Sequence, residues 1–183
     1  PGDQFGNYNP DQDGSRRTTA NGQLGWQFTE GQRLGVTLMQ SKLDAQYDSS
    51  QWLPPDYAQD NTPDFRNKLE NQVASIDHRG VWSPAWTTTV RASAQESDLH
   101  SGGTETSRFR TRRQQLDAQA TWKPAAGQRL TFAYEGVEEK ADAPAYGKQR
   151  DNQALVLAWL GDVAGVQVQA DLRHDDNSAY GNV

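Results

Sequence analysis

Apolar and polar residues alternate along most of this chain. Between residues 23 and 28, Leu24, Trp26 and Phe28 fall on one side and the residues between them fall on the other. A period of two is the pattern of a β-strand whose faces differ, because successive side chains point to opposite sides. The pattern recurs near residues 34–47, 69–82, 86–94, 115–122, 130–135, 154–160 and 166–173. The sequence therefore predicts an all-β fold, an antiparallel meander of about eight strands.

One pattern occurs twice, at residues 26–34 and 122–130. Each copy has a Trp at the end of one alternating run, a Gly in a short turn, and Gln-Arg-Leu at the start of the next run. Gly31 and Gly127 are expected to adopt the positive φ that a short hairpin turn needs. Two copies at matching places indicate a repeated hairpin unit, as in a meander or a barrel.

Polar stretches separate the alternating runs and are expected to be loops. They are residues 1–14, 48–67, 100–107, 138–150 and 174–183. The predicted connections then alternate short and long, and the tryptophans lie beside the short ones. These tryptophans are Trp26, Trp82, Trp86, Trp122 and Trp159. Strands of about ten residues, short turns on one side, long loops on the other and a rim of aromatic residues are typical of a transmembrane β-barrel.

The two predicted faces also differ in charge. The face that carries the tryptophans, here called the outward face, is apolar. Residues 154–160 are apolar on both sides, and Leu155, Leu157 and Trp159 are assigned to the outward face. The opposite, inward face carries Asp77, Arg79, Arg91, Asp117, Glu135, Asp171 and Arg173. These charges are tolerated if the inward face lines water, whereas an Arg facing mid-membrane lipid would cost about 2–4 kcal/mol.

A soluble antiparallel sandwich is the alternative fold, since one buried and one wet face also give alternation. It would bury Leu116, Leu130, Val166 and Val168 in a closed core. The sandwich explains neither the tryptophans along one rim nor the alternation of loop lengths, so the pattern favours the barrel.

The composition fits strands with one apolar face joined by polar segments. Hydrophobic residues make up 34% of the 183 residues and the mean hydropathy is −0.94, yet the chain has six Trp and six Tyr, which disordered chains lack. The net charge of −6 disfavours nucleic acid as a partner. The absence of Cys removes disulfides and thiolate chemistry. No apolar run approaches the ~20 residues of a membrane helix.

Four short motifs, in order and at matching spacing, resemble the barrel of TonB-dependent outer-membrane receptors, most closely those that import cobalamin. They are DQDG at residues 11–14, YD at 47–48, PDFRNKL at 63–69 and RHDDNSAYG at 173–181. The resemblance covers nearly the whole chain. It implies a barrel of roughly 22 strands with a plugged lumen, located in the bacterial outer membrane and in contact with its lipid.

The same resemblance implies that residues 1–183 are one fragment of such a barrel, without the plug domain and the closing strands. The implied function is to bind and import cobalamin (vitamin B12) or a related corrinoid, with energy supplied through TonB. Siderophore receptors share the scaffold and are the alternative. The unpaired sheet edges of a fragment are expected to pair with a second copy, or the sheet to curl into a smaller barrel.

The candidate site residues are mainly acidic. Asp11 and Asp13 place two carboxylates before a Gly; calcium takes about six to eight oxygen ligands, although such a motif is more often an Asx-rich turn. The resemblance adds Asp48 and Asp64 as calcium ligands on neighbouring loops, and it assigns Tyr47 to the substrate site. The alternative for Tyr47 is a rim aromatic. A bound cation would order the acidic loops before the substrate arrives.

Catalysis is not expected. His100-Ser101 and His174-Asp175 are sequence neighbours, which is not the convergent geometry that a hydrolase needs. His78 is predicted to be a surface or packing residue on the outward face. Outer-membrane lipases are barrels too, so a Ser/His hydrolase stays an alternative. A soluble, secreted β-protein that uses the acidic loops for calcium-dependent ligand binding is the second function hypothesis.

Overall fold

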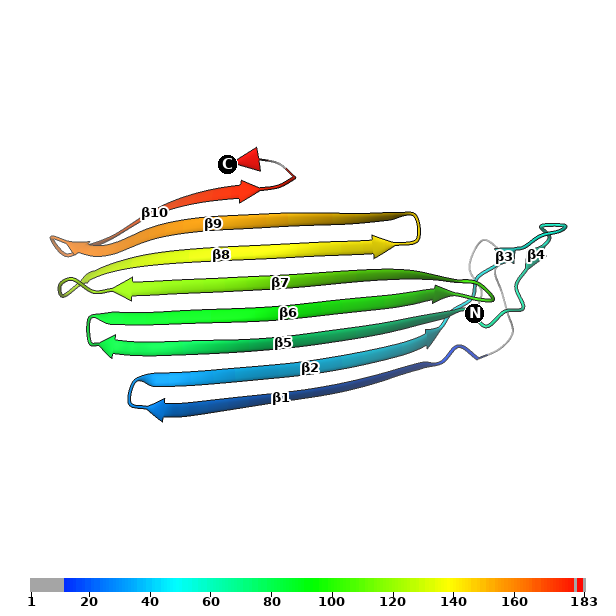
Figure 1. Ribbon diagram of the computed structural model, residues 1–183, viewed down its shortest axis with the longest axis horizontal. Coiled ribbons are helices and arrows are strands. Elements are labelled where there is room, and N and C mark those ends of the chain that lie inside the picture. Colours follow the sequence, from blue (N-terminus) through cyan, green and yellow to red (C-terminus); the bar gives the residue numbers. More distant parts are fainter. Residues whose placement is uncertain (1–11, 180, 183) are drawn as a thin grey trace.

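The chain forms a single antiparallel β-sheet with a small two-stranded ribbon at one end (Figure 1). The computed structural model describes residues 12–179, 181 and 182. Each strand of the sheet pairs with the next one along the sheet, in the order β1-β2-β5-β6-β7-β8-β9-β10-β11, and β3 pairs with β4. The strands are β1 (Ser15–Thr29), β2 (Gln32–Gln46), β3 (Gln51–Trp52), β4 (Gln59–Asp60), β5 (Arg66–Ser83), β6 (Trp86–Gly102), β7 (Thr106–Trp122), β8 (Gln128–Ala143), β9 (Tyr146–Val163), β10 (Val166–Asn177) and β11 (Gly181–Asn182).

The predicted meander of about eight strands is confirmed by the eight long strands of this sheet. The strands β3, β4 and β11, each of two residues, were not predicted. The long strands exceed what a membrane needs: β5 and β9 have 18 residues each, whereas about 9–11 residues cross the bilayer. Roughly half of each of these strands is therefore enough to cross a bilayer.

Two of the predicted loops are wrong, and a third, 174–183, is strand as far as Asn177. The stretch 100–107 lies mostly in strands, because β6 runs to Gly102 and β7 starts at Thr106. The stretch 138–150 is also mostly strand, with only residues 144 and 145 between β8 and β9. The predicted alternation of short and long connections fails with them. Residues 47–65, between β2 and β5, do form a long connection that carries β3 and β4.

The hairpin turns at the other end follow the prediction. Gly31 and Gly127 have φ values of 75° and 72°. A third turn pairs Ala164 (φ 55°) with Gly165 (φ 81°). Two successive positive φ values are those of a type I′ turn, whose twist suits a two-residue hairpin. We call this end of the sheet the turn end and the end with residues 47–65 the loop end.

The strand register confirms the predicted outward face. Tyr134 of β8 lies opposite Leu155 of β9, and Leu155 lies opposite His174 of β10. Leu157 likewise lies between Phe132 and Leu172. The assignment of residues 155, 157 and 159 to the outward face is therefore confirmed.

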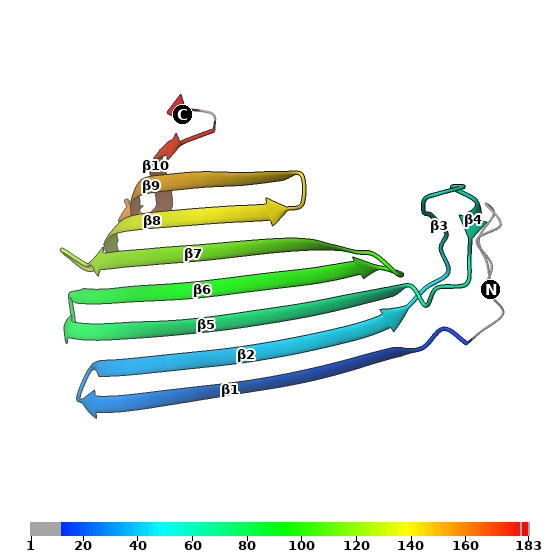
Figure 2. The ribbon, with the colours of Figure 1, turned by 45° about the vertical axis from the view of Figure 1, so that its right-hand side comes forward.

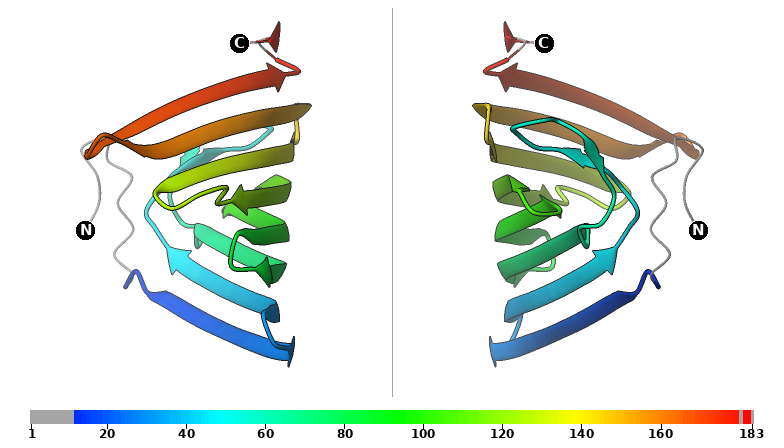
Figure 3. Two further views of the ribbon diagram at one scale, coloured as in Figure 1. Left: turned by 90° about the vertical axis from the view of Figure 1, so that its left-hand side faces the viewer. Right: turned by 90° about the vertical axis from the view of Figure 1, so that its right-hand side faces the viewer.

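The sheet is one layer thick, and Figures 2 and 3 show that it curves. Among the described residues, only Phe65 and Ala154 are buried hydrophobic side chains. The sandwich alternative is wrong for these residues, since Leu116 is 44% exposed and Val166 is 62% exposed. No helix in the described part of the chain is long and apolar enough to cross a membrane.

Candidate functional site

The outward face at the turn end is apolar and bordered by indoles. Register places Trp86 opposite Trp122, Trp122 opposite Leu130, and Leu130 opposite Trp159. The Nε1 of Trp159 donates a hydrogen bond to Gln128 over 2.8 Å. A side chain with an apolar body and a satisfied polar edge suits the boundary between lipid and water. The predicted tryptophan rim is confirmed.

Towards the loop end the same outward face becomes charged. On β2, Leu38 is followed at the next outward positions by Gln40 and Lys42; on β6, Ala94 is followed by Glu96. We call this outward set the charged belt. It consists of Lys42, Glu70, Glu96, Asp98, Arg108, Arg110, Arg112 and Lys140. Across neighbouring strands Lys42 pairs with Glu70, Arg108 with Asp98, and both Arg110 and Arg112 with Glu96, whereas Lys140 pairs with Glu138 on its own strand. The apolar part of β5, from Ala74 to Trp82, is about 26 Å long at ~3.3 Å per residue, which matches a membrane-sized band.

The inward face shows the reverse change. At the turn end it carries the predicted charges: Asp77 pairs with Arg91, and Arg91 with Asp117. The alternation of sign across three strands is favourable for cross-strand neighbours. A polar hollow of about 540 Å³ surrounds these residues and also contacts Glu135 and Arg173. This half of the inward face is therefore suited to water.

At the loop end the inward face carries an apolar row. Register places Leu43, Leu69, Leu99 and Phe109 directly opposite one another on β2, β5, β6 and β7. We call these four residues the inward apolar row. The sequence analysis missed this row. Its signal is a change of phase: Leu34, Val36 and Leu38 occupy even positions of β2, whereas Leu43 occupies an odd one.

Tyr47 lies just beyond this row and is held in place by three contacts. Its backbone N–H donates to the carbonyl oxygen of Phe65 over 3.1 Å. Its ring lies 5.9 Å from the ring of Phe65, which is only 6% exposed. Its hydroxyl is hydrogen-bonded to Ser101 Oγ at 3.1 Å. Tyr47 is thus fixed on the inward side, at the loop end of the sheet.

A second set of contacts joins two neighbouring connections at the loop end. Gln51 of β3 donates to Thr104 Oγ1 over 2.9 Å and accepts from the Thr104 backbone N–H at 3.3 Å. Phe65 packs against Gly103, where an added Cβ would come within 2.9 Å of the ring. Residues 47–65 are therefore anchored to the β6–β7 connection. Trp52 and Tyr57 of the same segment are 54% and 62% exposed.

The four predicted calcium ligands are not brought together in what the structure describes. Asp11 lies outside the described residues. Asp13 is exposed and Asp48 is half-buried. Asp64 accepts hydrogen bonds from Arg66 Nε (2.7 Å) and Gln46 Nε2 (3.1 Å). Within residues 12–179, no three acidic or His side chains are placed to hold a metal ion.

The environment of Asp64 is that of an ion pair. Hydrogen bonds from Arg66 and from Gln46 hold the pKa of the Asp64 carboxyl below its usual range. Arg66 also binds Asp44, at 2.9 Å from Nη1 to Oδ1. Asp64 therefore stays ionised down to a lower pH than a free aspartate, and its two oxygens already have partners.

The histidines do not form a hydrolase-like cluster with their neighbours. His100 lies 3.6 Å from Asp98 on the outward face, while the adjacent Ser101 bonds Tyr47 on the inward side. His78 bonds Gln32 at 3.0 Å and stacks on Phe28 at 6.1 Å. The outward packing position predicted for His78 is the one that the structure shows.

Solved structures of two other proteins resemble this fold. The siderophore receptor PirA from Pseudomonas aeruginosa aligns with a TM-score of 0.75 and 19% identity, over 92% of this chain and 29% of that chain. OmpT, an outer membrane protein of Vibrio cholerae, aligns with a TM-score of 0.55 and 14% identity, over 93% of this chain and 52% of that chain. No protein-family model and no curated protein matches the sequence.

At these identities the likeness concerns the fold. The chain has the architecture of part of an outer-membrane β-barrel wall, as the alternation predicted. It spans less than two thirds of the length of either protein.

Proposed function

We propose that this chain forms part of the wall of a TonB-dependent receptor in the bacterial outer membrane. One observation carries the proposal: the sheet has an apolar outward band of membrane height and a charged inward face. Such a sheet suits lipid on one side and water on the other. Similarity to PirA, a siderophore receptor, over 92% of the chain favours a receptor barrel over a soluble calcium-binding module.

The mouth of the barrel at the loop end is the proposed contact region for the substrate. The inward apolar row is a surface that would bind the apolar parts of a ligand. Tyr47, held by Phe65 and Ser101, supplies a fixed aromatic edge with a hydroxyl beside it. Apolar and aromatic walls with few polar groups are typical of sites for large organic ligands. The expected substrate is a bulky organic ligand.

Cobalamin is the first candidate for this substrate. The supporting observation is the resemblance of the motifs that contain Asp13, Tyr47, Asp48 and Asp64 to those of cobalamin receptors. Calcium, bound by these aspartates and by Asp11, would order the loops. An iron–siderophore complex is the second candidate, and it is favoured by the alignment with PirA.

The test is a titration of the full-length protein, purified in detergent, with cyanocobalamin and with a panel of ferric siderophores. Each titration is repeated with calcium and with a chelator. The proposal expects saturable binding of one of these ligands, and uptake in cells only when TonB is present. Cobalamin binding that weakens with chelator supports the calcium assignment. Binding of neither class, or uptake without TonB, would contradict the proposal.

A further inference from the structure

Two arginines face each other on the inward side of the sheet at its turn end. Register places Arg33 of β2 directly opposite Arg79 of β5. Both occupy odd positions, which point inward on these strands, and both residues are exposed. Like charges directly opposite each other destabilise a sheet. We call these two residues the arginine pair.

No acid of the described chain neutralises the arginine pair. The guanidinium of Arg33 lies over Gly25 of β1, where an added Cβ would come within 2.8 Å of Arg33 Nη2. The carboxylate of Asp77, two positions along β5 from Arg79, lies over Gly35, where an added Cβ would come within 2.5 Å of Oδ1. Among the described residues, no carboxylate is within ion-pair distance of either arginine. The two positive charges therefore face the lumen without a counter-charge from these strands.

Neutral side chains flank the arginine pair on both neighbouring strands. Gln27 of β1 lies opposite Arg33, and Thr89 of β6 lies opposite Arg79. Both side chains can donate a hydrogen bond, and neither carries a charge. The polar hollow of about 540 Å³ reaches Thr89. Open space therefore adjoins the guanidinium of Arg79.

Other charged residues of the inward face at the turn end do have compensating neighbours. Arg91 lies directly opposite Asp117. Asp117 and Glu135 are themselves like charges in opposite positions. Each of them has a partner, since Asp117 accepts a hydrogen bond from Gln115 over 2.8 Å and Glu135 lies 3.9 Å from Arg173. The arginine pair differs from these residues because nothing in the described chain offsets its repulsion.

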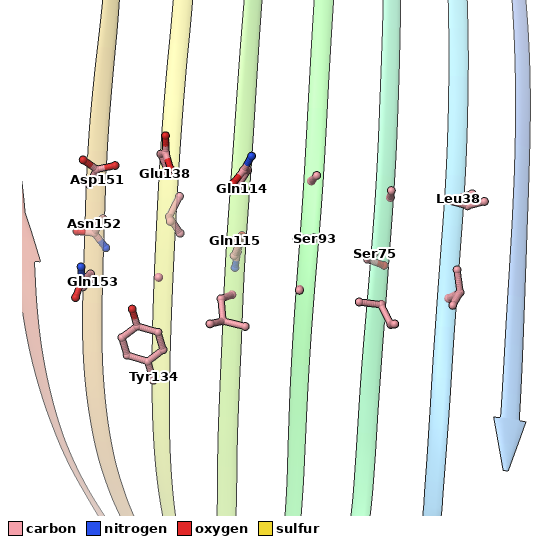
Figure 4. Close-up of a pocket in the computed structure, with 18 residues that line it drawn as sticks. Leu38, Ser75, Ser93, Gln114, Gln115, Tyr134, Glu138, Asp151, Asn152 and Gln153 are labelled. Atoms are coloured by element: carbon pink, nitrogen blue, oxygen red, sulfur yellow. The ribbon is translucent and has the colours of Figure 1, made fainter. Parts of the chain in front are cut away.

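Towards the loop end the inward wall becomes neutral on β5, β6 and β7. Ser75, Ser93 and Gln115 lie directly opposite one another on these strands. Figure 4 shows them among the residues that line a hollow of about 790 Å³. No acid of this row competes for the arginine pair from the loop-end side.

We propose that the arginine pair is an anion site on the inward wall, which binds a carboxylate or phosphate group of a solute in the lumen. One oxyanion between the two guanidinium groups accepts hydrogen bonds from both and replaces their repulsion by attraction. Gln27 and Thr89 supply neutral donors on either side. The inference rests on the proposed function only in that the inward face lines water, and it does not depend on which substrate is imported.

The experiment uses the full-length protein, purified in detergent in a buffer with chloride as its only inorganic anion. Inorganic phosphate is titrated at constant ionic strength, and calorimetry gives its affinity. The test variants are Arg33→Gln and Arg79→Gln. The matched control is Arg91→Gln, which removes the same charge from the same wall at a position that faces an acid.

We expect the affinity for phosphate to fall about tenfold in each test variant, because one partner in charge-assisted hydrogen bonds is lost, and to stay unchanged in the control. Without phosphate, both test variants should melt at the same temperature as the wild type or higher, because the repulsion is gone. A lower melting temperature of the test variants without phosphate would overturn the proposal, since a carboxylate of the protein itself would then hold the pair. Equal phosphate affinities of the wild type and the test variants would also overturn it.

Uptake by cells identifies the source of the anionic group. If the group belongs to the imported substrate, added phosphate and Arg79→Gln each slow uptake, while the affinity of the purified protein for that substrate is unchanged. If the ligand is a free anion, neither changes uptake and only the calorimetric loss remains. Both results uphold the site and assign its ligand. Failure of the proposed function is a separate result, because the wild type would then bind neither class of substrate in the titration described above.

Discussion

The two ends of the same strands carry opposite patterns. At the turn end the outward face is apolar and bordered by tryptophans, and the inward face holds Asp77, Arg91 and Asp117. At the loop end the outward face is the charged belt and the inward face holds the inward apolar row. The backbone pairing continues through both halves, with register shifts beside the turns between Gln27 and Thr29 and between Val81 and Ser83. The polarity of each position therefore follows its surroundings, lipid or water, and not the strand itself.

Charge in the apolar band should give the largest effect. Ile76→Arg places a guanidinium on the outward face within the band and should destabilise the full-length protein by about 2–4 kcal/mol, because lipid cannot solvate it. Gln40→Arg, on the outward face at the loop end, should cost about 0–1 kcal/mol. Urea unfolding in lipid vesicles measures both. An equal loss of stability in the two variants would contradict the proposed difference between the turn end and the loop end of the outward face.

The inward apolar row should matter for ligand binding. Leu99→Asn removes apolar contact area from the row and should weaken substrate binding about tenfold, which corresponds to about 1.4 kcal/mol. Ser97→Asn, on the same face of the same strand, is the matched control and should change the affinity little. Titration of the two variants with the substrate of the wild type gives the ratio. An unchanged affinity of the Leu99→Asn variant would show that the inward apolar row does not take part in substrate binding.

The rim tryptophans should contribute to the stability of the protein through the hydrogen bonds of their indole N–H groups. Trp82 donates a hydrogen bond to Thr88 Oγ1 over 2.8 Å, so Trp82→Phe should cost about 1 kcal/mol. Trp52→Phe, at the exposed end of the loop, should change stability by less than about 0.5 kcal/mol. Unfolding in vesicles measures both variants. A larger loss at Trp52 would reverse the assignment of the lipid boundary.

The smallest effect concerns pH at the loop end. Because Arg66 and Gln46 lower the pKa of Asp64 in the folded state, its contribution is complete above the unfolded pKa of about 3.9 and is lost as the pH falls through the folded value below it. Residues 47–65 should stay ordered at pH 5 and loosen only in stronger acid. Trp52 fluorescence reports this change. Asp64→Asn should remove most of this acid-induced change in fluorescence, whereas Asp56→Asn should not alter it.

The alternation predicted the part of each strand that crosses the membrane. It assigned Leu155, Leu157 and Trp159 correctly even in an ambiguous run, since only one choice continues the outward rows of β8 and β10. It failed where strands pass beyond the lipid. Around residues 138–150 both faces are wet, so the sequence looks like a loop. There the strands are held by the backbone ladder and by ion pairs such as Arg113 with Glu139 at 2.9 Å.

The candidate site was less accessible to prediction. Tyr47 was identified only through the resemblance, because its contacts with Phe65 and Ser101 join residues 18 and 54 positions apart. The inward apolar row needs the register of four strands before its members line up. Asp64 was predicted as a calcium ligand, and no sequence pattern showed that Arg66 would bind it.

The central claim is that outward residues of the band face lipid while their neighbours face water. The chain contains no Cys, so single cysteines can be placed from Ala74 to Trp82 in the full-length protein. Labelling with a membrane-impermeant maleimide in intact outer membranes reads the accessibility of each. The account predicts that cysteines at odd positions, such as Ser75 and Asp77, react and that those at even positions, such as Ala74 and Ile76, do not. Equal reactivity along the strand, or the reversed pattern, would contradict it.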